Sequence, residues 1–284
     1  MILRFDHVNY VYDADGGQPV HALSDINLTI GEGEFIGLIG HTGSGKSTLI
    51  QHADGLLKPV SGRILADGED IWEEKFDRKA LRARVGLVFQ YPEHQLFEED
   101  ILSDVCYGPM NLGCSAEEAR ERAVSALRQV GIGEDLFGQS PFDLSGGQKR
   151  RTAIAGVLAM QPEILILDEP TAGLDPRGRD EILALARTLH EERNITVVLV
   201  SHSMEDIARF AKRLLVLGDG RLVFDGPTGE VFSHRAELEE MGLEIPRPQR
   251  LLEALKEHGF PEIGTGAYTA EEAARLILQE LEKR

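Results

Sequence analysis

Eight consecutive residues near the start of the chain have the composition and order of a phosphate-binding loop. Residues 40–47 read Gly-His-Thr-Gly-Ser-Gly-Lys-Ser, which fits the pattern G-x-x-x-x-G-K-[ST]. Glycines allow consecutive backbone N–H groups to turn toward one point, where they hold phosphate oxygens. We expect Lys46 to reach the β- and γ-phosphates of a nucleotide and Ser47 to offer its hydroxyl to Mg²⁺. The predicted nucleotide-binding residues are Gly40, His41, Thr42, Gly43, Ser44, Gly45, Lys46, Ser47 and Thr48.

Two adjacent carboxylates follow a second apolar segment. Residues 164–169 read Ile-Leu-Ile-Leu-Asp-Glu, an aliphatic strand that ends in Asp168 and Glu169. Asp168 is placed to hold Mg²⁺ through water, and Glu169 to polarise a water for attack on the γ-phosphate. An Asp-Glu pair after a strand is often only a solvated turn, but together with the phosphate loop the pair indicates phosphoryl-transfer chemistry.

A second anion cradle lies further along the chain, where residues 144–148 read Leu-Ser-Gly-Gly-Gln. A Ser-Gly-Gly run that opens a helix presents backbone N–H groups to an anion. One nucleotide needs only one phosphate loop, so the second cradle makes physical sense if it serves a nucleotide held by another subunit. With these three motifs in this order, the sequence resembles the ATP-binding subunits of ABC transporters.

The resemblance implies roles for further residues. Gln90 matches the Q-loop glutamine, which contacts Mg²⁺ and the attacking water and faces the membrane partner. His202 matches the switch histidine, which contacts the γ-phosphate. Asp175 ends the run Ala-Gly-Leu-Asp at 172–175, which matches the D-loop that crosses the dimer interface.

For the adenine, the resemblance favours Tyr12 as the stacking aromatic, with Tyr10 as the competing choice. Because Glu169 and the signature motif are intact, the resemblance implies ATP hydrolysis with ATP and Mg²⁺ as the required small molecules. The implied sets are Glu169, His202 and Gln90 for catalysis; Ser47, Gln90 and, through water, Asp168 for Mg²⁺; and Ser145, Gly146, Gly147 and Gln148 toward the partner's ATP.

Several strings are similar to one branch of this superfamily, the energy-coupling factor (ECF) transporters. They lie at residues 90–97 (QYPEHQLF), 149–151 (KRR), 155–160 (AGVLAM) and 241–246 (MGLEIP). Among ECF ATPases the chain is most similar to the second type, which usually pairs with a first-type partner. The alternatives are an ATPase of another ABC transporter and a soluble non-transport ABC ATPase. ABC ATPases of DNA repair insert long coiled coils between the phosphate loop and the signature motif. Here Ser47 and Ser145 are only 98 positions apart, with no heptad tract between them.

The resemblance also implies partners and a location. They are a second ABC-type ATPase subunit, in a hetero- rather than a homodimer, a transmembrane coupling protein and, indirectly, a substrate-binding membrane protein for vitamins or transition-metal ions. The implied location is peripheral, at the cytoplasmic face of the cell membrane. Acidic residues near Gln90 either receive basic side chains from the coupling protein or, for 98–100, form a solvated face; they are Glu93, Glu98, Glu99 and Asp100.

The elements that must position these residues follow an α/β pattern. Short β-branched runs separated by helical patterns predict a mostly parallel sheet flanked by helices, the P-loop NTPase fold of ABC type. The expected sheet strands are 35–40, 85–90, 163–168, 195–201 and 213–217. Residues 2–12 and 26–30, joined by the Asp15-Gly16-Gly17 turn, predict an N-terminal antiparallel β layer, and 218–220 a hairpin turn.

The chain is predicted to divide near residue 230. Residues 1–230 would form the ATP-binding domain, with a helical subdomain at about 92–160 that includes a capped helix starting at Ser115. Residues 231–284 would form a short helical appendage with helices near 249–258 and 270–281. Leu276, Ile277 and Leu281 are expected to form one apolar stripe. A tail packed on its own domain and a dimerisation or regulatory appendage both remain open.

Composition excludes several other classes of protein. The chain has 284 residues, 42% of them hydrophobic, and a net charge of −18 at pH 7. No stretch approaches the ~20 apolar residues that a bilayer requires, and the start lacks a signal-peptide pattern. Because the phosphate backbone of a nucleic acid repels a chain this acidic, no nucleic-acid partner is expected. Cys106 and Cys114 are expected to be free thiols in a reducing cytoplasm.

Overall fold

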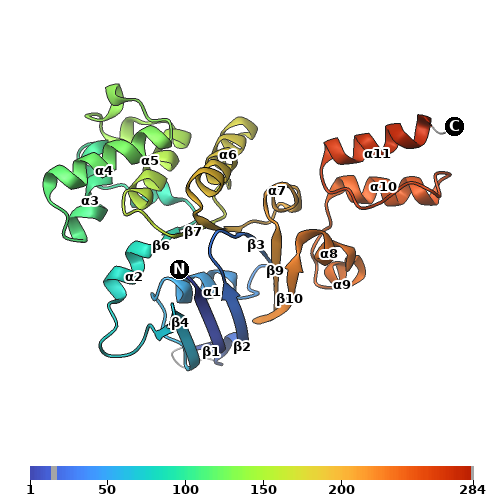
Figure 1. Ribbon diagram of the computed structural model, residues 1–284, viewed down its shortest axis with the longest axis horizontal. Helices are drawn as coiled ribbons and strands as arrows, with labels where there is room; N and C mark the ends of the chain where they lie inside the picture. The colour runs from blue at the N-terminus through green and yellow to red at the C-terminus, as the bar shows by residue number, and fades with distance from the viewer. Residues whose placement is uncertain (14–17, 283–284) are drawn as a thin grey trace.

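The core of the molecule is a six-stranded sheet in the order β10-β9-β3-β8-β7-β6. The structure, a computed structural model, describes residues 1–13 and 18–282 (Figure 1). All strand pairs in this sheet are parallel except β9 with β10. The strands are β3 (Phe35–Ile39), β6 (Val85–Val88), β7 (Ile164–Asp168), β8 (Thr196–Val200), β9 (Arg213–Gly218) and β10 (Arg221–Pro227). Every residue of β3, β6, β7 and β8 is buried, which explains their mostly apolar composition and agrees with the predicted parallel sheet.

A second, four-stranded sheet confirms the predicted antiparallel layer. Its order is β2-β1-β4-β5, and its pairs are antiparallel. The strands are β1 (Leu3–Tyr12), β2 (Val20–Ile30), β4 (Ser61–Ala66) and β5 (Glu69–Asp70). The predicted Asp15-Gly16-Gly17 turn lies outside the described residues. One hydrophobic cluster joins this layer to the main sheet, because Phe5 and Ile64 pack with Ile36 and Leu215.

Helices flank the main sheet (Figure 1). In Figure 1, α3, α4 and α5 lie together on one side of the view, apart from the antiparallel sheet, with α6 beside them. Ser115 and Ser145 accept hydrogen bonds at the starts of α4 and α5, and the cap at Ser115 was predicted from the sequence. The helices are α1 (Lys46–Ala53), α2 (Arg78–Arg84), α3 (Ile101–Asn111), α4 (Ala116–Gln129), α5 (Gly146–Leu158), α6 (Pro176–Arg193) and α7 (Met204–Phe210), with short 3₁₀ turns η1 (Pro92–Gln95), η2 (Glu134–Leu136) and η3 (Pro141–Asp143).

The C-terminal part contains α8 (Thr228–Ser233), α9 (Arg235–Glu240), α10 (Arg247–Glu257) and α11 (Ala270–Glu282). Phe232 and Leu238 belong to the main hydrophobic core, whereas α10 and α11 share a small cluster of their own. Leu276 and Ile277 pack against that cluster, but Leu281 is 51% exposed, so the expected three-residue stripe is wrong at Leu281. The division at residue 230 remains a prediction.

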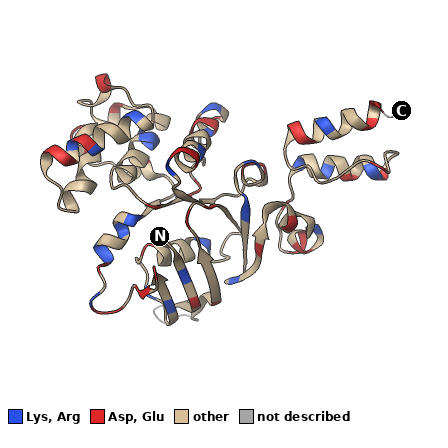
Figure 2. Ribbon diagram, viewed as in Figure 1, with Lys and Arg blue, Asp and Glu red and all other residues tan. Residues whose placement is uncertain are grey.

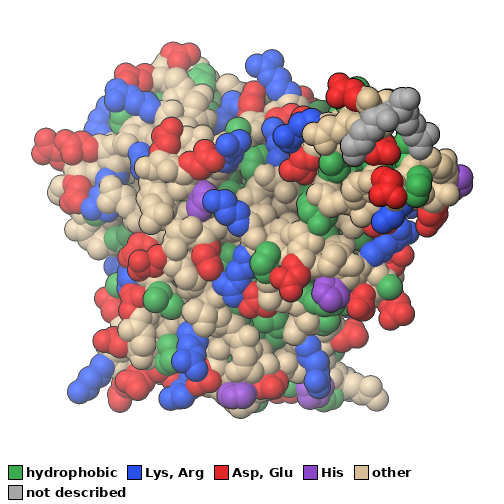
Figure 3. Space-filling model, turned by 45° about the vertical axis from the view of Figure 1, so that its right-hand side comes forward, with side chains coloured by type: hydrophobic (Ala, Val, Ile, Leu, Met, Phe, Trp, Pro, Cys, Tyr) green, Lys and Arg blue, Asp and Glu red, His purple; other side chains and the backbone are tan. Residues whose placement is uncertain are grey.

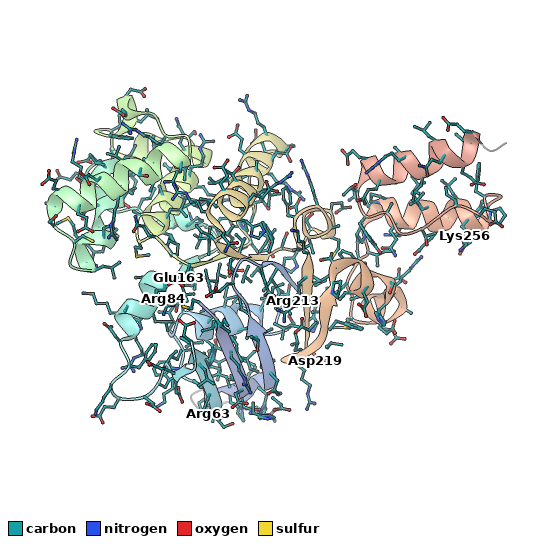
Figure 4. All side chains as sticks on the ribbon, viewed as in Figure 1. Arg63, Arg84, Glu163, Arg213, Asp219 and Lys256 are labelled. Carbon is teal, nitrogen blue, oxygen red and sulfur yellow. The ribbon has the colours of Figure 1, made fainter. Side chains whose placement is uncertain are left out.

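Charged side chains cover the molecule without forming a basic area on the face in view. Most helices carry both basic and acidic residues, whereas α2 carries only basic ones (Figure 2), and both signs are interspersed on the face shown in Figure 3. One ionic network ties strand starts together: Arg84, before β6, donates to Glu163, before β7, at 2.5 Å (Figure 4). The amino group of Met1 lies 2.9 Å from the same carboxylate. In the described part of the chain, no helix is long and apolar enough to cross a bilayer.

A buried carboxyl at the end of α1 makes a prediction about stability. Asp54 caps α1 and is 6% exposed, and burial raises the pKa of its carboxyl to about 6 from an ordinary 3.8. The folded state therefore binds this proton more tightly than the unfolded chain, and the ionised carboxylate destabilises the fold increasingly as the pH rises from about 4 to 6. We expect Asp54→Asn, which can still accept the Leu56 N–H, to raise the free energy of unfolding at pH 8 by about 1–3 kcal/mol.

Urea unfolding at pH 8 and pH 5 measures this effect. The gain should be smaller at pH 5, and Asp143→Asn, at an exposed position, should change the free energy by less than about 0.5 kcal/mol. A gain that is absent at pH 8, or larger at pH 5 than at pH 8, would contradict the burial argument.

Candidate nucleotide site

The predicted site residues converge because parallel strands end at one edge of a sheet. The phosphate loop begins directly after β3, and Asp168 is the last residue of β7. Gln90 follows β6, and His202 follows β8. In the sheet order, β3, β8, β7 and β6 are consecutive neighbours, so four loops meet at their carboxyl ends, where open α/β sheets bind ligands.

The phosphate loop contains glycines of two kinds. A Cβ at Gly40 would lie 2.4 Å from the Leu217 carbonyl oxygen, and one at Gly45 would lie 2.4 Å from that of Ala22. These two glycines are therefore required by the packing of the loop on its own chain. Gly43 also has a left-handed φ of 83°, but a Cβ there would meet nothing within 4 Å. The space beside Gly43 is open to a ligand, as a phosphate cradle requires.

The side chain of Lys46, the first residue of α1, folds back onto the phosphate loop. Its Nζ donates to the carbonyl oxygens of Gly40, at 2.6 Å, and His41, at 3.1 Å. Burial lowers the pKa of Lys46, while Glu169 and Asp168 oppose that shift. The ammonium thus lies between the loop and the two carboxylates, in position to exchange carbonyl oxygens for phosphate oxygens.

Loss of this ammonium should weaken nucleotide binding. We expect Lys46→Ala to bind MgATP about 10- to 100-fold more weakly, because a buried charge-assisted contact to phosphate contributes about 1.5–3 kcal/mol. Equilibrium titration with a fluorescent ATP analogue measures the change. Lys58→Ala, at a lysine on the antiparallel-sheet side, is the matched control and should bind as the natural chain does. Equal affinities for both variants would refute the assignment of Lys46.

Ser47 and Asp168 supply oxygen ligands that suit Mg²⁺. The Ser47 hydroxyl lies 3.5 Å from Oδ2 of Asp168, the last residue of β7. Burial raises the pKa of Asp168, and Lys46 opposes the shift. Over residues 1–13 and 18–282 no group of three or more His, Cys, Asp or Glu is arranged to hold a metal alone. Mg²⁺ commonly takes one or two protein oxygens and completes its shell with phosphate and water.

Glu169 is held in a strained conformation with one oxygen unsatisfied. Its φ is 48°, in the left-handed region that non-glycine residues rarely adopt, and its N–H donates to the Val200 carbonyl at 3.0 Å. Oε1 is buried and accepts no hydrogen bond within the described residues, while His202 Nε2 lies 3.4 Å away. Burial raises the pKa of Glu169 to about 7; a hydrogen bond from the backbone of His202 opposes this shift, and the charge of Asp168 adds to it. A buried carboxylate with a free oxygen and this pKa is suited to accept a proton from water.

Two other predicted residues lie beside the site without contacting its carboxylates. Gln90 is exposed, and no hydrogen bond to it is present among the described residues. Tyr12 is 41% exposed, and its hydroxyl lies 3.3 Å from Thr48 Oγ1, next to the phosphate loop. Tyr10 packs edge-on against both Tyr12 and the buried His52. The Tyr12 ring is therefore the more available for stacking, which supports the preference for it.

The second cradle lies outside the cavity of the chain's own site. Ser145 caps α5 through a capping box with Gln148, in which the Ser145 N–H donates to Gln148 Oε1 at 3.0 Å. Ser145 and Gly146 are exposed, and a Cβ at Gly146 or Gly147 would meet nothing within 4 Å. The chain's own packing thus gives no reason for glycine there. None of the four signature residues lines the 1080 Å³ cavity beside Glu169 and His202.

Other residues show roles that sequence patterns alone missed. Asp175 caps α6 by accepting from the Gly178 N–H at 2.9 Å, so it has a structural task within the chain. Arg179 pairs with Asp206 at 2.8 Å and links α6 to the helix after His202. Arg150 is buried against the segment after Gln90. In the sequence Arg150 was marked only as part of the string at 149–151 (KRR), which gave it no structural role.

One expectation about the acidic residues is corrected by the structure. Glu93 was expected to be available to a basic partner, but its carboxylate receives two hydrogen bonds from Arg150. Asp100 caps α3 and accepts from Ser103. Of the four carboxylates, only Glu98 and Glu99 have no side-chain partner among the described residues.

The fold and this site define an ATP-binding cassette, the nucleotide-hydrolysing unit of ABC proteins. A family model described as ABC transporter matches residues 23–172. A dimeric ATP-binding cassette in a post-hydrolysis state, bound to ADP and Pi, superimposes with a TM-score of 0.71, 33% identity and coverage of 80% of this chain and 98% of that one. The structure of cbiO1 from Clostridium perfringens, part of the ABC transporter complex cbiONQ, superimposes with a TM-score of 0.73 and 40% identity, and the match covers 88% of this chain and 98% of that one.

Full-length relatives narrow the family. The energy-coupling factor transporter ATP-binding protein EcfA2 of Clostridium tetani is 51% identical over 98% of this chain and 97% of its own length. Its counterpart in Caldanaerobacter subterraneus is 50% identical over 99% and 98%. The chain therefore belongs to the family of energy-coupling factor transporter ATP-binding proteins, which confirms the predicted fold class and the ECF resemblance.

Proposed function

We propose that this chain is an ATPase subunit that powers an ECF-type importer, working head to tail with a second ATPase subunit. The observation that carries the proposal is the separation of the two cradles. Gly146 and Gly147 have no packing reason to be glycine, and neither lines the cavity where His41 and Thr42 of the phosphate loop meet Glu169 and His202. An ATP held at Lys46 of one subunit would then also contact the serine and glycines of the other.

The catalytic roles follow from the geometry of the site. Lys46 and the loop N–H groups would bind the phosphates, and Ser47, Asp168 and Gln90 would hold Mg²⁺, which neutralises charge on the phosphates when bound. Glu169 would take a proton from the attacking water, and His202, whose Nε2 lies 3.4 Å from Glu169 Oε1, would contact the γ-phosphate. Tyr12 would stack on the adenine, and Asp175 would approach the partner subunit.

A groove beside the α3–α5 helices is suited to the membrane partner. It has a volume of 630 Å³ and is lined by Phe97, Tyr107 and Met160, with Lys79 and Arg82 at the α2 side. Phe97 and Tyr107 are 57% and 47% exposed, so apolar surface is available to a partner's helix. Because this groove begins a few residues after Gln90, a docked helix would be adjacent to the catalytic edge of the sheet.

The location and the remaining partners follow from this assignment. The chain would lie peripherally at the cytoplasmic face of the cell membrane, bound to a transmembrane coupling protein. The second ATPase would be a first-type subunit, making a heterodimer. A separate membrane protein would select the substrate, a vitamin or a transition-metal ion, and would contact this chain only indirectly; no nucleic acid would take part.

Affinity purification tests the proposal. The tagged chain would be recovered from detergent-solubilised native membranes and its partners identified by mass spectrometry. We expect a second ATPase, a coupling membrane protein and one or more small substrate-binding membrane proteins. Recovery of only soluble partners, from a preparation that still hydrolyses ATP, would favour a non-transport ABC ATPase instead.

A further inference from the structure

The guanidinium of Arg150 is buried where three loops of the site come together. Arg150 lies in the second turn of α5, five residues after Ser145, and only 2% of its side chain is exposed. Nε and Nη2 donate to the two carboxylate oxygens of Glu93, at 3.0 and 2.7 Å. Nη1 donates to the carbonyl oxygens of Pro170, at 3.0 Å, and Ala172, at 2.7 Å.

Each of these partners belongs to a segment with a task at the nucleotide. Glu93 lies in η1, three residues after Gln90. Pro170 and Ala172 lie between Glu169 and Asp175, in the turn that connects the catalytic carboxylate to the expected dimer contact. One side chain therefore connects the helix that presents the signature, the segment after Gln90 and the turn after Glu169.

Tyr91 completes the junction. Its φ of 57° is left-handed, and the Arg150 guanidinium carbon lies 5.9 Å from the centroid of its ring. A Cβ at Gly173 would lie 3.8 Å from Tyr91 Cε1, so the ring rests against the same turn that Nη1 contacts. Strain of this kind is retained where the surrounding structure imposes it.

The geometry requires arginine specifically. A guanidinium is a planar fork that can bind a carboxylate with two parallel N–H groups while a third nitrogen donates elsewhere. A lysine at the same position offers one point charge, which cannot reach Glu93 and two carbonyls in these directions at once. Removing the charge would leave Glu93, at 17% exposure, without its partner.

We propose that Arg150 is a positioning residue that makes these three segments move as one unit. When a membrane partner displaces the segment after Gln90, the Arg150 contacts carry α5 and the 170–175 turn with it, so signature and catalytic turn reach the nucleotides together. The inference rests on the proposed function, because it assigns to Arg150 the mechanical link between the membrane partner and the ATPase dimer. It gives Arg150 no contact with ATP.

The test uses the intact complex purified from membranes, with two variants of this chain. Arg150→Lys keeps the charge but loses the fork. Arg150→Met with Glu93→Leu replaces the ion pair with apolar side chains of similar size, which commonly preserves stability. For each complex, kcat and KM for MgATP and the melting temperature would be measured.

If Arg150 has a positioning role, its variants should lose ATP turnover without a matching loss of ATP affinity or of stability. We expect both variants to lower kcat by about 10- to 100-fold with KM within about twofold, because the phosphate loop is untouched. The apolar pair also leaves the Pro170 and Ala172 carbonyls without the guanidinium, so it should melt somewhat below the natural complex, no lower than the core variant Leu127→Ala, and still turn over slowly. If the apolar pair hydrolyses ATP within about threefold of the natural rate, Arg150 only supports the fold and the inference is overturned.

Two controls keep the result decisive. Arg187→Lys, in an exposed pair with Glu191 on α6, should leave kcat unchanged, and Leu127→Ala, in the core of α4, reports the effect of lost stability alone. If the apolar pair does not fold, Arg150→Lys decides, since a natural kcat for it overturns the inference. Failure of the proposed function is seen separately, in the natural chain, when no membrane protein is recovered with it.

Discussion

Glu169→Gln should bind MgATP with natural affinity and hydrolyse it about 10²- to 10⁴-fold more slowly, the usual range for loss of a general base. The amide has the size of the carboxyl but cannot accept a proton from the attacking water. In the natural chain the carboxyl is poised for that step, because Oε1 is buried without a hydrogen bond and burial raises its pKa to about 7. Steady-state phosphate release and ATP binding, measured on the same preparation, separate the two effects.

The variant should also accumulate the closed ATPase dimer, because ATP that persists keeps the two subunits together. Size-exclusion chromatography with ATP would show this as a shift toward the dimer that ADP does not produce. Glu191→Gln, in an exposed pair with Arg187, is the matched control and should behave as the natural chain. Phosphate release by Glu169→Gln at the natural rate would remove Glu169 from the general-base role.

Much of the fold was predictable because burial on both sides of a sheet forces a simple sequence pattern. Strands such as Phe35–Ile39 and Ile164–Asp168 are apolar up to the point where a motif with recognisable chemistry begins. Since parallel strands share one carboxyl edge, the convergence of the phosphate loop with Asp168, Glu169 and His202 follows from topology. The helix starts at Ser115 and Ser145 are local hydrogen-bond patterns and were likewise readable.

What escaped prediction depends on contacts between distant residues. Arg150 and Glu93 are 57 positions apart, and neither side chain alone indicates that they form a buried pair. The same holds for Asp54, because no local sequence pattern predicts that its side chain is buried at the end of α1. The prediction for Leu281 was wrong for a related reason. Helical spacing indicates which residues share a face, but it does not show whether another part of the chain covers that face, and Leu281, one residue before the end of α11, is 51% exposed.

Ser145→Arg should abolish steady-state hydrolysis in the assembled complex, with a loss of at least about 10²-fold, while leaving MgATP binding to the chain's own phosphate loop intact. Ser145 is exposed at the start of α5, next to glycines whose Cβ positions are empty, so the variant places a long side chain where the partner's nucleotide must approach. The chain's own nucleotide is held elsewhere, by the loop at Lys46. The expected signature is therefore normal binding by the isolated chain and failed turnover by the complex.

Loss of the helix cap is the competing explanation for such a result, because Ser145 Oγ also accepts the Gln148 N–H at 3.3 Å. Ser115→Arg isolates that contribution, since Ser115 caps α4 by accepting the Glu118 N–H at 3.2 Å and is exposed on the same helical group. Both variants lose one cap, worth about 1 kcal/mol, and gain the same charge, so their melting temperatures should fall together. Only Ser145→Arg should stop turnover. Normal turnover by a complex that contains Ser145→Arg would refute the head-to-tail arrangement, because a nucleotide that this cradle must touch would then be hydrolysed without it.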